Sequence, residues 1–440
     1  MKPSLYLTLM IVLTISCVAQ ESETAEVPSV DATSAPATLT GQSVRPGLLT
    51  DIESPNNVSG GVSISQLFTD NAGLTSSDHV SDLSYIIQPT ITLKHFTPRF
   101  SYDLGVLAGF VVNRTFSERN QATQSAAFDL SYGLAQFVTL RVSDTFTNST
   151  GLWAGAGTSA NIDTGVGIGP VQQGNSSLIT YGSFRMNNVL AELSGQLNPI
   201  SFAGIRATHS YTWFPSATTD PVLGTLYGGN VYSAEAFYNH QFTLRNWGGI
   251  IARTQRFDIG RSVGNTGTES LLFLYAFNFR PNVSLSFFGG PELSTTAVAQ
   301  GISVPVVPFP RRMWSPAAGA VFSGHGRTMG GTASFTRLIN GGGGLSSAVT
   351  LDSADAEVFR QFGRFQLGPG FTYSLSTPIV TSSALRTYSG RLQLTYHVGN
   401  VALSGAYGRD NRTVVDSNAS ASANNIWVSF SYGFFKPLGR

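Results

Sequence analysis

The chain has 440 residues, of which 42% are hydrophobic and only 12% are charged. A typical soluble domain carries roughly 25% charged residues, so part of this protein's surface is expected to face something other than water. The net charge is +1, with 26 basic and 25 acidic residues and no long tract of either sign. This balance excludes the electrostatic footprint of a nucleic-acid-binding protein.

The N-terminus, residues 1–19, has the three parts of a cleavable secretory signal peptide. Lys2 precedes an apolar stretch, and the small residues Cys17 and Ala19 form a cleavage site after Ala19. Cleavage there leaves a chain without cysteine, which suits an oxidising periplasm. In the alternative interpretation Cys17 is the acylated first residue of a lipoprotein, although Thr14 stands where an aliphatic residue is usual. Both interpretations predict export.

Two further regions follow the signal peptide. Residues 20–58 are rich in Ser, Thr, Pro and Ala and lack apolar periodicity, which predicts a flexible periplasmic extension rather than a folded plug. Residues 59–440 contain no run of about 18 apolar residues, which excludes membrane-spanning helices. Low charge without such runs favours a transmembrane β-barrel, whose lipid-facing and lumen-facing residues alternate.

Alternation with period two is clearest at residues 100–112, where apolar side chains on one face oppose small and polar ones on the other. Residues 83–94 alternate in the same way, and Thr97, Pro98 and Arg99 form a short turn between the two segments. Two such segments predict a hairpin, and each exceeds the roughly 9–11 residues that cross a bilayer as a strand. Repeats of this unit predict an all-β, antiparallel up-and-down barrel of about 18 strands, within a range of 16–18.

The connections between the predicted strands alternate in length. Short turns fall near residues 98, 135, 199, 244, 281, 325, 363 and 399, and longer polar or Gly-rich connections near 75, 120, 165, 222, 262, 302, 342, 380 and 416. This pattern predicts short periplasmic turns on one rim and long extracellular loops on the other. Pro89, Pro316 and Pro369 lie inside predicted strands, where we expect a bulge or a strand boundary.

The last predicted strand alternates Val428, Phe430, Tyr432 and Phe434 with small residues. With this strand the chain resembles bacterial outer-membrane β-barrels, porin-like ones in particular, over roughly residues 60–436. The resemblance implies an outer-membrane location, contact with lipid, recognition of the final strand by the barrel-assembly machinery, and a homo-oligomer. The chain departs from the family by continuing past its terminal aromatic residue, so that rule is only partly met.

Sequence motifs give no catalytic or metal-binding constellation. The six histidines lack metal-ligand spacing, and the His-x-Ser pair of His79 and Ser81 has no orienting third group. The glycine run at 341–344 is not followed by Lys-Ser or Lys-Thr, so it does not predict a phosphate-binding loop. We therefore expect no enzyme activity, no cofactor and no metal.

Charged residues on the polar parity of the strands are the candidate pore-lining residues. They are Lys94, Asp103, Asp129, Arg141, Glu192, Arg206, Glu235 and Arg391. A Lys or Arg pointing outward at mid-membrane would cost roughly 2–4 kcal/mol, which favours the inward direction. Acidic and basic residues are equal in number, so the set predicts no strong ion preference.

An 18-stranded barrel is wide enough for an aqueous channel, so the leading hypothesis is passive diffusion of small hydrophilic solutes. The Gly-rich connection at 148–177 is the candidate for an inward-folded constriction, with an exposed loop as the alternative. A second hypothesis is a non-conducting barrel whose extracellular loops bind a partner or surface, as in an adhesin. A third, an outer-membrane lipid hydrolase, has only His79 and Ser81 to support it.

Overall fold

The computed structural model describes most of the chain from residue 56 onward. The described residues are 56–117, 120–150, 183–214, 219–220, 224–225, 228–259, 264–280, 282–297, 312–341, 348–379, 384–415 and 419–437. The predicted signal peptide, residues 20–55 of the predicted extension, and residues 151–177 of the predicted constriction loop lie outside these residues. Among the residues that the structure describes, no helix has the length and apolar character needed to span a membrane.

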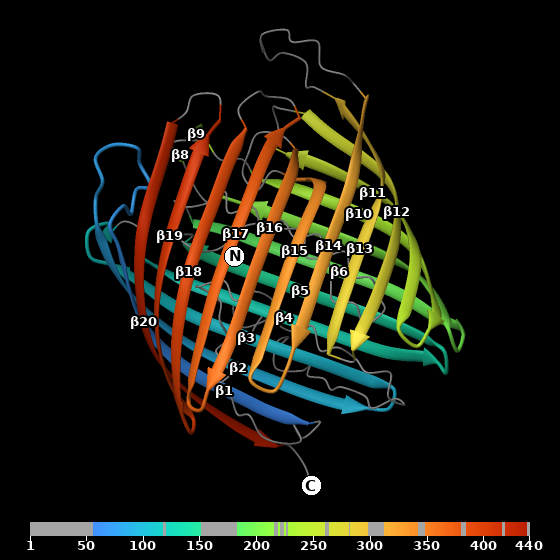
Figure 1. Ribbon diagram of the computed structural model, residues 1–440, viewed down its shortest axis with the longest axis horizontal. Coiled ribbons are helices and arrows are strands. Elements are labelled where there is room, and N and C mark those ends of the chain that lie inside the picture. The colour runs from blue at the N-terminus through green and yellow to red at the C-terminus, as the bar shows by residue number, and fades with distance from the viewer. Residues whose placement is uncertain are drawn as a thin grey trace, which may run out of the picture.

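Eighteen long strands of the described chain form one sheet (Figure 1). They are β1 (Asn57–Thr69), β2 (Asp82–Thr97), β3 (Phe100–Asn113), β4 (Gln121–Ala135), β5 (Val138–Thr150), β6 (Ser183–Asn198), β7 (Ser201–Trp213), β10 (Gly229–Thr243), β11 (Asn246–Ile259), β12 (Gly264–Arg280), β13 (Val283–Ala297), β14 (Arg312–His325), β15 (Met329–Asn340), β16 (Val349–Phe362), β17 (Phe365–Pro378), β18 (Leu385–Val398), β19 (Val401–Val414) and β20 (Ala419–Pro437). The short strands β8 (Thr219–Asp220) and β9 (Gly224–Thr225) pair with each other outside this sheet.

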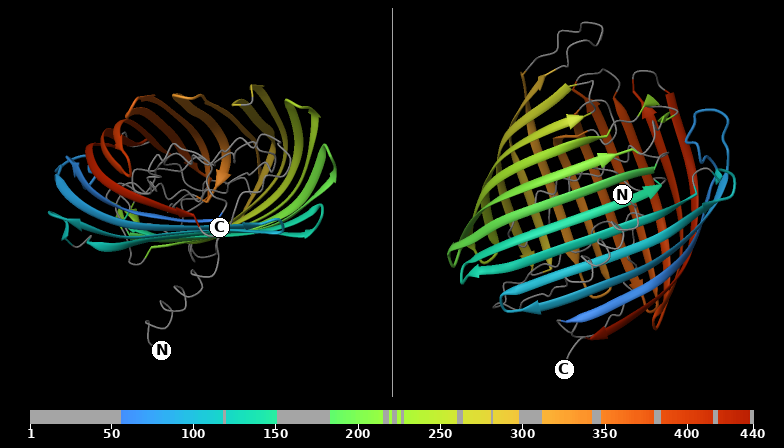
Figure 2. Two further views of the ribbon diagram at one scale, coloured as in Figure 1. Left: turned by 90° about the horizontal axis from the view of Figure 1, so that it is seen from below. Right: turned by 180° about the vertical axis from the view of Figure 1, so that it is seen from behind.

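The sheet closes on itself. Each long strand pairs antiparallel with the next long strand along the chain, and β1 also pairs antiparallel with β20, from Asn57↔Pro437 to Thr69↔Asn425. Figure 2 shows the strands surrounding the interior, and strands on opposite walls cross at an angle. Closure leaves no strand of this sheet at an outer edge, as a barrel in lipid requires. The predicted all-β, up-and-down barrel of about 18 strands is confirmed.

The two rims differ in the length of their connections. Eight connections of two or three residues join β2–β3, β4–β5, β6–β7, β10–β11, β12–β13, β14–β15, β16–β17 and β18–β19, and the longer connections lie at the other rim. Gly363 and Gly399 adopt positive φ angles of 61° and 53° in two of the short turns, a conformation that glycine takes without a Cβ penalty. The predicted asymmetry of the rims is confirmed.

Large apolar side chains cover the outer wall. Phe110 is 61% exposed, Phe273 54%, Phe371 50% and Phe430 46%, although each lies well inside a strand. The residues of opposite parity on the same strands point into the barrel and are mostly polar or buried. An exposed apolar belt on a closed barrel is stable only against the hydrocarbon core of a membrane.

Two of the prolines do not act as expected. Around Pro89 the β2–β3 register stays the same, with Ile87↔Phe110 on one side and Thr90↔Leu107 on the other. Pro369 likewise lies in a two-residue interruption of the β16–β17 ladder without a shift in register. The expected bulge or strand boundary is therefore wrong at both positions. A missing proline N–H interrupts the pairing locally, and the flanking ladder holds the strand straight.

Candidate functional site

Charged side chains form a row across the inner wall from β2 to β11. In register, Lys94 lies beside Asp103, which lies beside Asp129. Continuing along the wall, the row contains Arg141, Glu192, Arg206, Glu235 and Arg253, each directly opposite the next on the neighbouring strand. Directly opposite residues have Cβ atoms roughly 4.5–5.5 Å apart, so these charges interact. We call these eight residues the charged row.

The part of the charged row on β2–β5 is accessible. The Lys94 Nζ lies 3.6 Å from the Asp103 carboxylate, and Arg141 binds Asp129 through Nη2 at 2.7 Å and Nε at 2.9 Å. The side chains of Asp103, Asp129 and Arg141 are 36–41% exposed, and that of Lys94 is 20% exposed. Exposed ion pairs contribute only about 0–1 kcal/mol to stability, so these pairs stabilise the wall only weakly.

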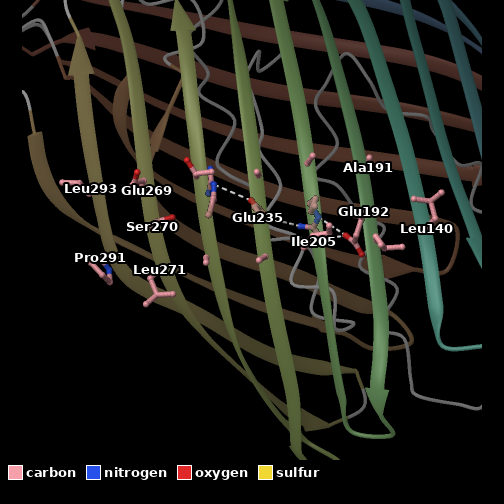
Figure 3. A pocket seen from close by; sticks show the side chains of 18 of the residues that line it. Leu140, Ala191, Glu192, Ile205, Glu235, Glu269, Ser270, Leu271, Pro291 and Leu293 are labelled. Carbon is pink, nitrogen blue, oxygen red and sulfur yellow. Dashed lines mark hydrogen bonds and ion pairs between the residues drawn. The ribbon is translucent and has the colours of Figure 1, made fainter. Parts of the chain in front are cut away.

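The part of the row on β6–β11 is buried. Arg206 lies between two carboxylates: its Nη2 is 2.6 Å from Glu192 Oε2, and its Nη1 is 3.3 Å from Glu235 Oε2. Arg253 Nε lies 3.5 Å from Glu235 Oε1. Figure 3 shows Glu192 and Glu235 on the strands at either side of β7, with these interactions as dashed lines. The four side chains are at most 9% exposed, and the alternation of sign offsets the desolvation of each charge.

Arg391 lies on another part of the wall. Its Nη2 is 2.9 Å from Glu357 Oε2, which lies two strands away on β16. Gly370 on β17 is the residue opposite Arg391, and a Cβ built on it would lie 2.8 Å from Arg391 Nε. The glycine therefore leaves room for the Arg391 side chain to cross β17. Thus seven of the eight predicted residues belong to the charged row, and Arg391 does not.

Several charged inner-wall residues were missed by sequence reasoning, among them Glu357, Arg412, Arg253 and Glu292. Arg253 lies in β11, where Ile250, Ile251 and Phe257 place apolar side chains on both parities and hide the alternation. Glu292 on β13 is 1% exposed and accepts a hydrogen bond from the Ile339 N–H at 3.1 Å. Arg253 is revealed only by the strand register, which places it opposite Glu235.

The inner wall also has an apolar region that the period-two pattern did not predict. A buried cluster spans β10–β15 and contains Phe237, Ile251, Leu272, Leu274, Ala276, Phe288, Ala317 and Leu338. Elsewhere the inner wall is hydroxyl-rich, as in the bonds between Ser374 and Thr387 at 2.5 Å and between Thr395 and Ser404 at 3.0 Å. We call the β10–β15 residues the inner apolar cluster. The barrel interior therefore combines a charged and hydroxyl-rich surface with an apolar region on β10–β15.

The residues considered for hydrolysis lie apart from the charged row. His79 and Ser81 are exposed in the connection between β1 and β2, and the Ser81 carbonyl accepts a hydrogen bond from Thr115 Oγ1 at 3.2 Å. In the described part of the chain, no group of three or more His, Cys, Asp or Glu side chains could hold a metal ion.

Comparison with known proteins finds likeness in structure only. No family model matches the chain, and no curated protein matches its sequence. Similar solved structures include the outer membrane protein OpdK of Pseudomonas aeruginosa, at 8% identity and a TM-score of 0.43 over 87% of this chain and 99% of that one. OccK2 (OpdF) of the same organism, solved with glucuronate, has 10% identity and a TM-score of 0.43 over 88% and 100%. OccAB4 of Acinetobacter baumannii has 11% identity and a TM-score of 0.43 over 86% and 98%.

The class of the protein follows from its own architecture. It has a closed antiparallel ladder of 18 strands, an apolar exterior, and rims of unequal loop length. These features together define a porin-like β-barrel protein of the bacterial outer membrane.

Proposed function

We propose that the protein is a channel for passive diffusion of small hydrophilic solutes. The observation that carries this proposal is the strand number: barrels of 16–18 strands are wide enough to leave an aqueous channel, whereas about eight strands are filled by side chains. The charged row and the hydroxyl-rich wall support it, because polar inner residues can hydrogen-bond to a polar solute and take the place of part of its hydration shell.

The two parts of the charged row would have different roles in the channel. Lys94, Asp103, Asp129 and Arg141 are partly exposed and would meet a passing solute. The members on β6–β11 are buried in ion pairs and would hold the wall in shape. Because the exposed members are two acids and two bases, the channel would discriminate by size and polarity more than by charge.

Three further features of the sequence belong to this proposal. Residues 1–19 would direct export and be removed, and the part of the predicted extension that precedes Asn56 and β1 would be a flexible periplasmic segment. The barrel-assembly machinery would recognise β20, whose outward Phe430, Tyr432 and Phe434 are 43–46% exposed. A homo-oligomer would form within the outer membrane.

Liposome swelling tests the proposal. Proteoliposomes are diluted into isosmotic solutions of sugars of increasing size, and the swelling rate is followed by light scattering. A diffusion channel gives rates that fall steeply with sugar size. Absence of swelling in vesicles shown to contain folded protein would refute the channel and favour loops that bind a partner or surface. Single-channel steps in a planar bilayer provide an independent readout of the same property.

A further inference from the structure

The ladder between β14 and β15 ends early. It runs from His325↔Gly330 to Ala318↔Arg337 and stops there, although β14 continues to Arg312. The flanking ladders do not stop: β13 pairs with β14 as far as Thr295↔Arg312, and β15 pairs with β16 as far as Asn340↔Val349. We call this boundary, residues 312–317 of β14 against 338–340 of β15, the β14–β15 seam.

Two side chains make an unpaired seam tolerable in the wall. Continuing the register two positions beyond Ala318↔Arg337 would place Pro316 opposite Ile339. Pro316 has no N–H to leave unsatisfied, and the Ile339 N–H is bound by Glu292 Oε2 of β13 at 3.1 Å. An unsatisfied backbone donor in a membrane protein is costly, and here neither strand leaves one at this position. Pro316 and Glu292 therefore allow the ladder to be interrupted here without an unsatisfied N–H at this position.

The end of β15 leans into the barrel, while β14 stays on the outside. Leu338, Ile339 and Asn340 are 3%, 0% and 3% exposed, although successive residues of a wall strand should alternate. Ile339 packs with Val231 and Phe257, which lie on the inner faces of β10 and β11. The outward Trp314 of β14, by contrast, is 69% exposed. In Figure 1 the end of β14 at this rim stands apart from the end of β15.

Apolar surfaces lie on both sides of the seam. Ala317 and Leu338, which would face each other across it, both belong to the inner apolar cluster. The outer wall has a hollow of about 1010 Å³ that reaches Pro291, Leu293 and Trp314 beside the seam. Figure 3 shows Pro291 and Leu293 together at one side of this hollow. At the seam, the inner apolar cluster is therefore separated from the outer wall by side-chain packing and not by ladder hydrogen bonds.

We propose that the β14–β15 seam is a lateral gate through which uncharged apolar molecules pass between the barrel interior and the surrounding lipid. Opening it breaks no ladder hydrogen bond beyond Ala318; it requires Leu338 to move from Ala317 and the Ile339 N–H to leave Glu292. The ligand class follows from the seam itself and the lipid outside it, because a charged molecule would be desolvated between Ala317 and Leu338 and in the hydrocarbon of the membrane. This route is distinct from passage of hydrophilic solutes along the barrel axis.

A covalent lock across the seam tests the gate. The sequence has one cysteine, at position 17, so the double variant Ala317→Cys with Leu338→Cys introduces an unambiguous pair. The pair is joined by oxidation or, where the thiols stay free, by a short bis-maleimide. The probe is N-phenyl-1-naphthylamine, which is uncharged and fluoresces on reaching lipid, added to intact Gram-negative cells that express equal amounts of each protein.

Wild-type protein is expected to raise the uptake rate of the probe at least fivefold over cells with an empty vector. The locked pair should return the rate to the empty-vector level, and reduction of the disulfide should restore it. The control pair Ser323→Cys with Thr332→Cys joins directly opposite residues in the intact part of the same ladder and should leave the rate unchanged when oxidised.

A third variant, Glu292→Gln, weakens the bond to Ile339 and should raise the uptake rate above that of wild type. The gate is refuted if wild-type cells take up the probe no faster than empty-vector cells, or if the locked protein remains as active as its reduced form. Sugar-driven swelling of the locked protein should equal that of wild type, so loss of the gate is distinguishable from loss of the diffusion channel.

Discussion

Arg206 offers the sharpest test of how the charged row acts on the barrel. The substitution Arg206→Met replaces the side chain by a shorter unbranched apolar one and removes the charge between Glu192 and Glu235. Its side chain is 1% exposed, and those of the two glutamates 9% and 3%, so both carboxylates lose a partner in a buried setting. Removing one member of a buried ion pair typically costs about 3–5 kcal/mol. We expect the free energy of unfolding to fall by about that amount.

The matched control is Arg141→Met, on a nearby strand of the same row. Arg141 makes an equally short ion pair, at 2.7 Å, but its side chain is 40% exposed and its partner Asp129 36%. Water replaces the lost partner there, so the expected loss is at most about 1 kcal/mol. Both proteins are unfolded from vesicles in guanidinium chloride and followed by tryptophan fluorescence. With unchanged slopes, the shift in midpoint reports the change in free energy.

A second substitution separates charge from packing. Adding Glu192→Gln to Arg206→Met neutralises one of the two carboxylates that lost a partner, and should recover about 1 kcal/mol or more of the loss, as expected for residues that interact directly. The reasoning is refuted if Arg206→Met destabilises the barrel no more than Arg141→Met. It is also refuted if Glu192→Gln makes the Arg206→Met protein less stable.

Three further predictions concern facing, selectivity and hydrolysis. In a planar bilayer under a salt gradient, Asp129→Arg should shift the reversal potential toward anion preference and Arg141→Glu toward cation preference, because each change leaves two like charges side by side. If neither variant shifts the reversal potential, the accessible part of the charged row does not line the path of the ions. Leu392 lies in the middle of β18 on the lipid-facing side and is 50% exposed, so Leu392→Arg should destabilise the barrel by roughly 2–4 kcal/mol. Gln393 is the next residue and points inward, so Gln393→Arg should change the free energy of unfolding by less than about 1 kcal/mol in the same assay. Equal effects of the two substitutions would contradict the directions assigned to these side chains. Ser81→Ala should behave like wild type with phospholipid vesicles, and a loss of lipid hydrolysis would revive the enzyme hypothesis.

Much of the architecture could be predicted from local pattern. A one-residue change of parity moves every side chain of a strand to the other face, and lipid tolerates few charges, so alternation determines which residues point inward. The short turns could be placed because a two-residue connection needs particular backbone geometry, as at Gly363 and Gly399. The strand pattern is least clear in β11 and β16, where apolar residues occupy both faces. At Pro89 the expected irregularity is absent because the flanking ladder hydrogen bonds keep the register despite the missing N–H.

Local alternation was enough to predict a barrel of 16–18 strands, rims of unequal loop length and the inward direction of the charged residues, since each hairpin can be recognised from its own residues. The tertiary structure alone decided the partners of the charged residues. Arg206 meets Glu235 through the register of β7 with β10, two strands that no short turn joins. Ile339 meets Val231 and Phe257 because the closed barrel brings β15 back to face β10 and β11. The β14–β15 seam also depends on the tertiary structure. Pro316 lacks a backbone donor because of its own ring, but only the fold brings Glu292 to the Ile339 N–H on the opposite strand.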